Sequence, residues 1–194
     1  MDNSNDLFLM QQCWSTLFSV TNKLQVKGDQ YLKKLTSRQI MAIVAIVHLP
    51  EGKTTLNNIA KKLGTTKQSV KQLITVMEKK GFVVTVPSLQ DKRAVNVIIT
   101  EAGKEATMSC AERTLDYFAD VFEQFTIEEM ETLWSLLKKL YRFDGEEQDG
   151  FEENVEYGAE DGLTDSQQAA MEKFNQRRSH SEDNYGNSEK ERDK

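Results

Sequence analysis

The sequence has few of the side chains from which metal sites and disulfide frameworks are built. It contains two cysteines, Cys13 and Cys110, and two histidines. The cysteines lie too far apart for a compact disulfide scaffold, and neither residue type shows the CxxC or HxxxH spacing of a structural zinc site. We therefore expect no metal and no other cofactor, and so little cysteine is consistent with a reducing cytoplasm.

Long apolar runs and catalytic signatures are also missing. The longest uninterrupted apolar run, Ile40 to Val47, is far below the roughly 20 residues that a membrane-spanning helix needs, and no basic-then-apolar leader opens the chain. The ten glycines form no phosphate-binding loop, and no Ser-His-Asp or Cys-His order is visible. These absences argue against a membrane protein and against an enzyme, and they favour a cytoplasmic location.

Charge, in contrast, is abundant and unevenly distributed. The whole chain has a formal net charge of −6, but residues 1–143 hold 19 Lys and Arg against 15 Asp and Glu, a net +4, while residues 144–194 hold 6 against 16, a net −10. Within residues 53–93 nine basic residues accompany two acidic ones, a net +7. A basic patch inside an acidic chain is what electrostatic attraction to a phosphate backbone requires.

The basic stretch predicts two helices joined by a turn. Apolar positions at helical spacing mark a short first helix, and Gly64 supplies the turn. A second helix covers residues 66–80, with a threonine cap at its start and a basic, amide-rich outer face. Gly81 can adopt the left-handed conformation that ends this helix.

A β-hairpin follows the helix pair. β-branched residues dominate residues 82–86 and 94–99, and the loop between them, residues 87–93, is too long for a two-residue turn. Helix, turn, helix and hairpin in this order predict a winged helix-turn-helix with its core at residues 36–100. In that architecture the second helix enters the DNA major groove.

Helices are predicted on both sides of this core. Residues 5–27 carry an apolar stripe wider than one neighbour covers, which indicates a partner chain or, alternatively, a helix lying across its own domain. Capping boxes at Thr36 and Thr126 begin further helices, and Thr100 is expected to begin one long helix that reaches Phe125. We therefore predict a mainly α (α+β) fold, a winged helix-turn-helix domain flanked by N- and C-terminal dimerisation helices.

The composition changes abruptly after Phe143. Residues 144–165 hold ten acids, four glycines and no Lys or Arg, too little apolar surface for an ordered fold, and a marginal helix extends through Phe174. We divide the chain into a DNA-binding and dimerisation domain at 1–143 and an acidic, disordered tail at 144–194. The tail either competes with DNA for the basic patch, or solubilises the protein or binds a partner.

Three short segments carry a recognisable pattern. They are EKKGFV at 78–83, Asp91-Lys92-Arg93 in the wing and ITEAG at 99–103. Their order and spacing resemble the multiple-antibiotic-resistance regulator (MarR) family of bacterial transcription factors, and the resemblance covers about residues 5–143. The strand entering the wing departs from the family pattern, because Thr85 and Val86 stand where members often carry a basic residue.

This resemblance implies a homodimer that binds double-stranded DNA at a pseudo-palindromic operator and usually represses transcription. In many members a small-molecule effector or thiol oxidation releases the DNA. Duplex DNA, a second copy of the chain and an effector are therefore the expected partners. The alternative is a winged-helix adaptor whose module and acidic tail bind proteins instead of DNA.

The candidate DNA-binding residues lie on the outer face of the second helix, at its start and in the wing. Gln and Lys side chains can pair with base edges or phosphates, unless they form an ordinary solvated face. Arg93 suits a narrow minor groove, with Asp91 orienting it or simply pairing with it, and the threonines either donate to phosphate or only cap the helix. The set is Thr65, Thr66, Lys67, Gln68, Ser69, Lys71, Gln72, Thr75, Lys92 and Arg93.

Two further sets of residues concern regulation. Cys13 lies roughly where one-cysteine hydroperoxide sensors of the family keep their thiol, with Tyr31 as a candidate phenol partner; the alternative is a small buried hydrophobe. Aromatic side chains either line a ligand pocket or belong to the core, and His48 favours a local contact at a helix C-terminus. The pocket candidates are Trp14, Phe18, Tyr31, His48, Trp134 and Tyr141.

Overall fold

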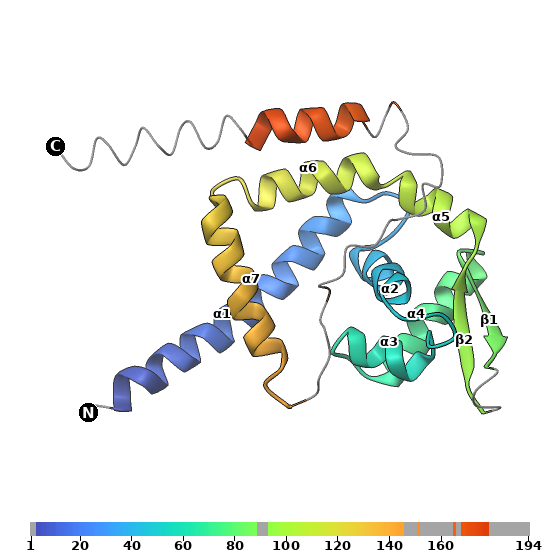
Figure 1. Cartoon of the computed structure of the whole chain (residues 1–194), viewed down its shortest axis with the longest axis horizontal. Helices are drawn as coiled ribbons and strands as arrows, with labels where there is room; N and C mark the ends of the chain where they lie inside the picture. The colour runs from blue at the N-terminus through green and yellow to red at the C-terminus, as the bar shows by residue number, and fades with distance from the viewer. Residues whose placement is uncertain (1–2, 89–92, 146–150, 152–164, 166–167, 179–194) are drawn as a thin grey trace.

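The computed structural model describes residues 3–88, 93–145, 151, 165 and 168–178. Along the chain its elements are α1 (Asn3–Tyr31), α2 (Ser37–Val47), α3 (Leu56–Lys62), α4 (Lys67–Lys79), β1 (Val83–Pro87), β2 (Val95–Ile99), α5 (Glu101–Met108), α6 (Ala111–Val121) and α7 (Ile127–Tyr141), and residues 168–178 add a further helix. In Figure 1, α2, α3, α4 and the hairpin gather at one end, and α1, α6 and α7 extend away from them. The predicted mainly α winged helix-turn-helix fold is confirmed.

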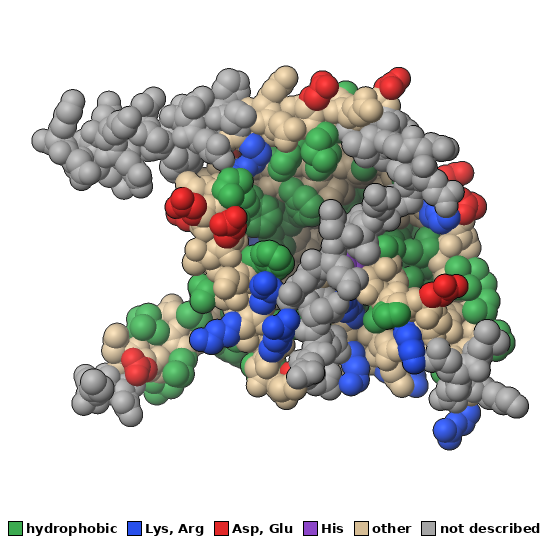
Figure 2. Space-filling model, in the orientation of Figure 1, with side chains coloured by type: hydrophobic (Ala, Val, Ile, Leu, Met, Phe, Trp, Pro, Cys, Tyr) green, Lys and Arg blue, Asp and Glu red, His purple; other side chains and the backbone are tan. Residues whose placement is uncertain are grey.

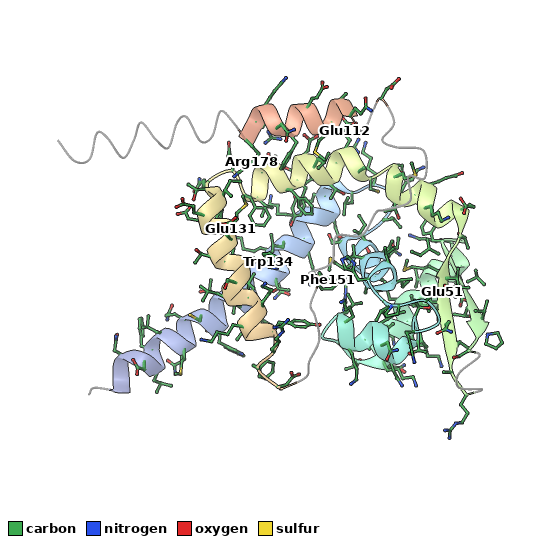
Figure 3. The ribbon with its side chains drawn as sticks, viewed as in Figure 1. Glu51, Glu112, Glu131, Trp134, Phe151 and Arg178 are labelled. Atoms are coloured by element: carbon green, nitrogen blue, oxygen red, sulfur yellow. The ribbon has the colours of Figure 1, made fainter. Side chains whose placement is uncertain are left out.

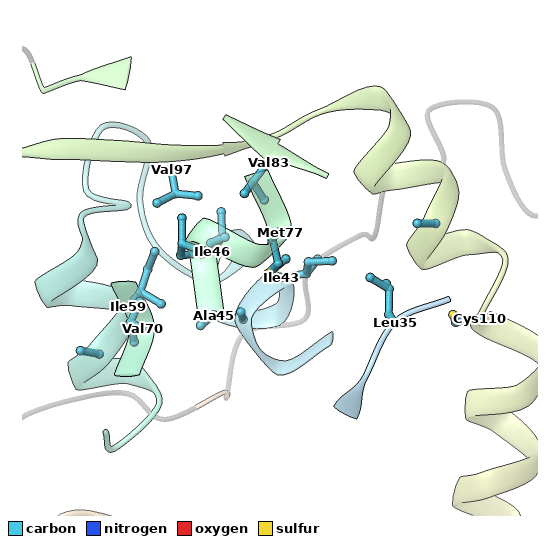
Figure 4. Packing of buried hydrophobic residues seen from close by; sticks show 14 residues of the cluster. Leu35, Ile43, Ala45, Ile46, Ile59, Val70, Met77, Val83, Val97 and Cys110 are labelled. Carbon is cyan, nitrogen blue, oxygen red and sulfur yellow. The ribbon is translucent and has the colours of Figure 1, made fainter. Parts of the chain in front are cut away.

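Helix α2 is the buried centre of the winged-helix core. Ile43 and Ile46 are 2% and 6% exposed, and they belong to one cluster with Ile59 of α3 and with Val70 and Met77 of α4 (Figure 4). Burial of these side chains removes apolar surface from water, which stabilises the fold by roughly 25 cal/mol per Å². The apolar composition of α2 therefore explains why the surrounding helices and the hairpin close around it.

Threonine side chains cap the N-termini of α2, α3, α4, α5 and α7. Each cap accepts a hydrogen bond from the backbone N–H three residues further on, which satisfies a donor that has no partner within the helix. Thr36 and Thr126 form full capping boxes with Gln39 and Glu129, as predicted. The caps are Thr36, Thr55, Thr66, Thr100 and Thr126.

The hairpin is tied to α4 by side-chain hydrogen bonds. Strands β1 and β2 pair antiparallel with Val83 opposite Ile99. Glu78 of α4 accepts hydrogen bonds at its Oε1 from the backbone N–H and the hydroxyl of Thr85, at 3.0 and 2.7 Å. Because a charged acceptor strengthens such bonds, the base of the wing has a fixed position relative to the second helix.

The single long helix expected after Thr100 is wrong, since the structure has α5 and α6 with a turn between them. The hydroxyl of Ser109 donates to the carbonyl oxygen of Ala106 at 2.7 Å, which is the acceptor that the N–H of Cys110 would use in a continuous helix. That N–H donates to Thr107 at 3.0 Å instead. A serine that competes for a backbone acceptor in this way favours a helix end.

Residues 168–178 form the helix expected in the tail, and it lies along α6 (Figure 1). Ala170 is buried, and Arg178 donates to the carbonyl oxygens of Phe122 and Phe125, the latter at 2.7 Å. A cation is also favoured there by the negative end of the α6 dipole. Part of the acidic tail is thus packed on the domain, while the domain boundary at residue 143 stays a prediction.

An acidic pair on α6 joins this tail helix to α1. Asp120 accepts a hydrogen bond from the hydroxyl of Tyr31 and pairs with Arg177, and Asp116 lies 3.1 Å from Lys173 and 3.4 Å from Arg177. The hydrogen bond to Asp120 raises the pKa of Tyr31. The same bond, together with the Arg177 guanidinium, lowers the pKa of Asp120. The network links α1, α6 and the tail helix.

We predict that Gly103→Ala destabilises the protein strongly. A Cβ at Gly103 would lie 2.1 Å from the carbonyl oxygen of Phe82 and 2.9 Å from Cγ2 of Ile99, so the junction between the hairpin and α5 must move. The free energy of unfolding, measured by urea denaturation, should fall by roughly 3 kcal/mol.

Gly64→Ala is the matched control for this substitution. Gly64 has φ +59° with nothing within 4 Å of an added Cβ, so only the backbone conformation is penalised, by about 1 kcal/mol. A loss at Gly103 no larger than the loss at Gly64 would show that the close approach to Phe82 is not a constraint.

Candidate nucleic-acid interface

Helix α4 presents a buried face to the core and a polar face to solvent. Val70, Ile74 and Met77 are at most 2% exposed and form the buried inner face. Thr65 and Ser69 are half-buried at the start of the helix. The exposed candidates are Thr66, Lys67, Gln68, Lys71, Gln72 and Thr75. The packing of the inner face holds these polar side chains outward as one surface.

The start of α4 is fixed by Thr66. Its Oγ1 accepts from the N–H of Ser69 at 3.1 Å and lies 3.0 Å from the Ser69 hydroxyl oxygen. Thr65 is not the cap, and its N–H donates to Ala60 at 2.9 Å. Further along the helix the Thr75 hydroxyl donates to the carbonyl of Lys71 at 2.8 Å, so its proton is already used.

The wing is described in part. Arg93 is exposed at the end of the loop, whereas Asp91 and Lys92 lie outside the described residues, so the proposed orientation of Arg93 by Asp91 stays a prediction. The hydroxyl of Thr85, where a basic residue was expected, bonds to Glu78. In this chain the side chain at position 85 therefore holds the base of the wing against α4.

Positive charge surrounds the start of α4. Lys67 and Lys71 are four residues apart on one face of the helix, no acidic residue stands in its first turn, and Lys61 and Lys62 end the neighbouring α3. The helix dipole adds positive potential at this terminus. In Figure 2 most Lys and Arg side chains lie in the lower half of the face, around α3 and the end of α7.

A hollow of about 260 Å³ opens between α2, α3, α4 and α7. Thr65 and Ser69 belong to its wall, so it borders the start of α4. The hydroxyl of Tyr141 donates to the carbonyl oxygen of Lys62 at 3.1 Å across one side. The residues that line the hollow include the polar side chains of Arg38, Lys62, Ser69 and Tyr141 and the apolar side chains of Leu73 and Phe151.

The aromatic side chains considered for a ligand pocket are only partly gathered at this hollow. Of the six candidates Tyr141 lines the hollow, and His48 packs against Phe151, which also lines it. His48 Nδ1 lies 2.8 Å from the carbonyl oxygen of Val44, which is the local contact expected at a helix C-terminus. The other four, which lie outside the hollow, are Trp14, Phe18, Tyr31 and Trp134.

Sequence reasoning missed three side chains of the hollow. Lys62 looks like a solvated charge in sequence but is 3% exposed. Phe151 stands alone in an acidic stretch, and Arg38 follows a helix cap. Helical periodicity places Lys62 next to the buried face of Ile59, so its burial could have been predicted from the sequence. Nothing local in the sequence points to Phe151.

The thiol site predicted at Cys13 is only partly supported by geometry. Cys13 is exposed in the single chain, so it is not a buried hydrophobe within one copy. Tyr31 lies at the other end of α1, about 27 Å away at 1.5 Å per residue, so the pairing of Cys13 with Tyr31 within one chain is also wrong. Reactivity of this thiol stays a prediction.

Among the residues that the structure describes, no group of three or more His, Cys, Asp or Glu side chains is placed to hold a metal ion. Within the same part of the chain no helix is both long and apolar enough to cross a membrane.

Helices α3 and α4, the turn at Gly64 and the paired strands define a winged helix-turn-helix protein. A family model described as the MarR family matches residues 33–94, which span α2 to the wing. The winged-helix part of the chain is therefore similar to that of MarR-family transcriptional regulators.

Known relatives extend the similarity beyond this module. The HTH-type transcriptional regulator SarZ of Staphylococcus haemolyticus is 29% identical over 129 residues, covering 65% of this chain and 83% of SarZ. The MepR–DNA complex of S. aureus is similar with 25% identity, a TM-score of 0.56 and coverage of 66% and 95%. Sco3205 of Streptomyces coelicolor, also in complex with DNA, has 20% identity, a TM-score of 0.62 and coverage of 72% and 93%. The family and these relatives are regulators and not enzymes.

We predict that Thr66→Ala lowers the free energy of unfolding by about 1 kcal/mol, because the N–H of Ser69 loses its acceptor. Urea denaturation measures the change. Thr65→Ala is the matched control and should change stability by less than roughly 0.5 kcal/mol, since Thr65 does not cap α4. Equal losses in the two variants would contradict the assignment of the cap.

Proposed function

We propose that this chain is a dimeric, sequence-specific repressor of the MarR type that binds a pseudo-palindromic operator in double-stranded DNA. Helix α4, within residues 66–80, enters the major groove, and the wing at 87–94 contacts the adjacent minor groove. The observation that carries the proposal is the exposed basic and amide-rich face of α4. The hydrogen bonds of Thr85 to Glu78 support it, because they set the wing beside that face.

Each type of side chain has a distinct proposed role. The glutamine amides match the edge of adenine, and the lysines donate to guanine or to phosphate oxygens. Arg93 enters the minor groove, where Asp91 orients it. The backbone at the start of α4 receives a phosphate. The proposed contacts are Thr65, Thr66, Lys67, Gln68, Ser69, Lys71, Gln72, Thr75, Lys92 and Arg93.

A second copy of the chain is the partner proposed for the apolar surfaces of α1 and α7. Phe8 and Trp14 on α1 are 56% and 69% exposed, and Trp134 and Leu136 on α7 are 51% and 59% exposed. Soluble monomers seldom expose so many large apolar side chains on neighbouring helices. Two-fold pairing through these helices presents two α4 helices to successive major grooves, which is why a pseudo-palindrome is the proposed operator.

The hollow beside α4 is the proposed site of a small-molecule effector. It combines the cationic Arg38 and Lys62 with apolar walls, and Thr65 and Ser69 belong both to its lining and to the proposed interface. An occupant therefore contacts α4 next to the proposed DNA contacts. Such a site is coupled to operator binding when the effector and the DNA prefer different positions of α4.

We predict that Lys71→Ala and Arg93→Ala each weaken operator binding. Loss of one phosphate contact should also flatten the plot of log affinity against log salt by ~1 unit. An operator is first selected from random duplexes, and fluorescence anisotropy is then measured across a salt series.

Lys104→Ala is the matched control for these variants. Lys104 pairs with Glu101 at 2.8 Å on α5, outside the proposed interface, so its removal should leave affinity and salt slope unchanged. Unchanged affinity and slope for both Lys71→Ala and Arg93→Ala would remove them from the interface. A protein that ignores duplexes even in dilute buffer would instead be the adaptor considered from the sequence.

We predict that Trp14→Glu weakens self-association, because a charge replaces an exposed aromatic side chain at the proposed dimer surface. A contact worth about 2 kcal/mol corresponds to a roughly 30-fold higher dissociation constant, which light scattering across a dilution series measures. Gln12→Glu adds the same charge to α1 at a polar position, so the dimer should persist. Dimers of equal stability in both variants would place the interface elsewhere.

A further inference from the structure

One aromatic side chain from the acidic stretch packs against the winged-helix core. Phe151 is partly buried against the core cluster. Its ring meets that of His48 edge-on, with centroids 5.4 Å apart and an interplanar angle of 82°, and Nζ of Lys62 lies 5.2 Å from its centroid. Edge-on aromatic contacts and cation–π contacts are both attractive at these separations. In Figure 3 the Phe151 side chain lies near the centre of the molecule, between α7 and α2.

The place that Phe151 takes is part of the hollow beside α4. The buried Lys62 gains a partner for its ammonium group in the ring, and its carbonyl oxygen accepts from Tyr141. Ser69 and Leu73 bring α4 to the same wall. The buried ammonium group beside the aromatic face and the edge-on contact with His48 together favour this position of Phe151 on the domain.

The sequence around Phe151 determines what this contact brings with it. Asp149, Glu152 and Glu153 flank Phe151, and residues 144–165 contain ten acids and no Lys or Arg. The wall of the hollow includes Thr65 and Ser69 of the proposed DNA interface. A tethered group has a higher effective concentration at its target when a second contact holds it nearby. Because these acids adjoin Phe151 in the sequence, seating of Phe151 tethers negative charge to the hollow.

We propose that Phe151 is an intramolecular anchor that holds the acidic stretch beside α4 and thereby lowers the affinity of the protein for duplex DNA. This inference rests on the proposed DNA-binding function. The carboxylates compete with DNA phosphates for the same lysines and for the start of α4. Because this competition is between charges, added salt reduces it, as the screening length falls from about 10 Å at 0.1 M to about 3 Å at 1 M.

Phe151→Ala in the full-length protein tests the anchor. At 50 mM salt we expect this variant to bind the selected operator ~3–10-fold more tightly than the unmodified protein, and at 300 mM salt within about twofold of it. Fluorescence anisotropy gives both affinities on the same labelled duplex. Phe151→Leu keeps an apolar side chain but loses the ring contacts with His48 and Lys62, so its affinity should lie between the two.

A charge variant tests the same idea without altering the packing of the ring. Replacing Asp149, Glu152 and Glu153 by their amides, with Phe151 kept, should give a similar gain at 50 mM salt. Combining this change with Phe151→Ala should add little, because both act on one interaction. If Phe151→Ala does not fold, the amide variant still decides the outcome.

The failure of the anchor can be distinguished from the failure of DNA binding. Operator binding by the unmodified protein with no gain in either variant at 50 mM salt would overturn the anchor and leave the proposed function intact. A gain that is equally large at 300 mM salt would also overturn it, because the effect would then not be electrostatic. If no form of the protein binds any duplex, both proposals fail.

Discussion

Burial of α2 is the constraint on which the rest of this structure depends. Its apolar side chains occupy most sides of the helix, so α3, α4 and the hairpin must cover it, and Ile43 and Ile46 meet Ile59 and Met77 in one cluster. The same packing that hides the inner face of α4 leaves its Lys and Gln side chains outward. The position of the proposed DNA-reading surface is therefore a consequence of hydrophobic burial on the other side of α4.

Local features of the fold could be predicted from the sequence because neighbouring residues determine them. Gly64 and Gly81 have φ of +59° and +74°, and Thr36 and Thr126 begin helices with the expected capping boxes. The outer face of α4 followed from helical periodicity alone. The break at Ser109 could not be foreseen in this way, because a serine within a helical pattern is compatible with either a continuous or a broken helix.

Contacts between distant segments were the part that could not be predicted. Phe151 meets His48 and Lys62, and Arg177 meets Asp120, in each case across more than 50 residues of chain. No periodicity reports such pairs, and composition alone makes the whole region after residue 143 look solvated. Instead, basic side chains of residues 168–178 form ion pairs with Asp116 and Asp120 of α6. The result is a domain whose C-terminal segment contributes packing as well as charge.

The turn at Ser109 and Cys110 has a mechanical consequence. Helix α5 continues from the hairpin, whereas α6 contacts α1. The turn therefore separates the helix attached to the winged-helix core from the helix attached to α1. No α-helical hydrogen bond spans the Cys110 N–H, because that group donates to Thr107. In the proposed dimer, a small change of angle at this joint alters the distance between the two α4 helices without breaking any regular helix, and the fit to successive DNA grooves depends on that distance.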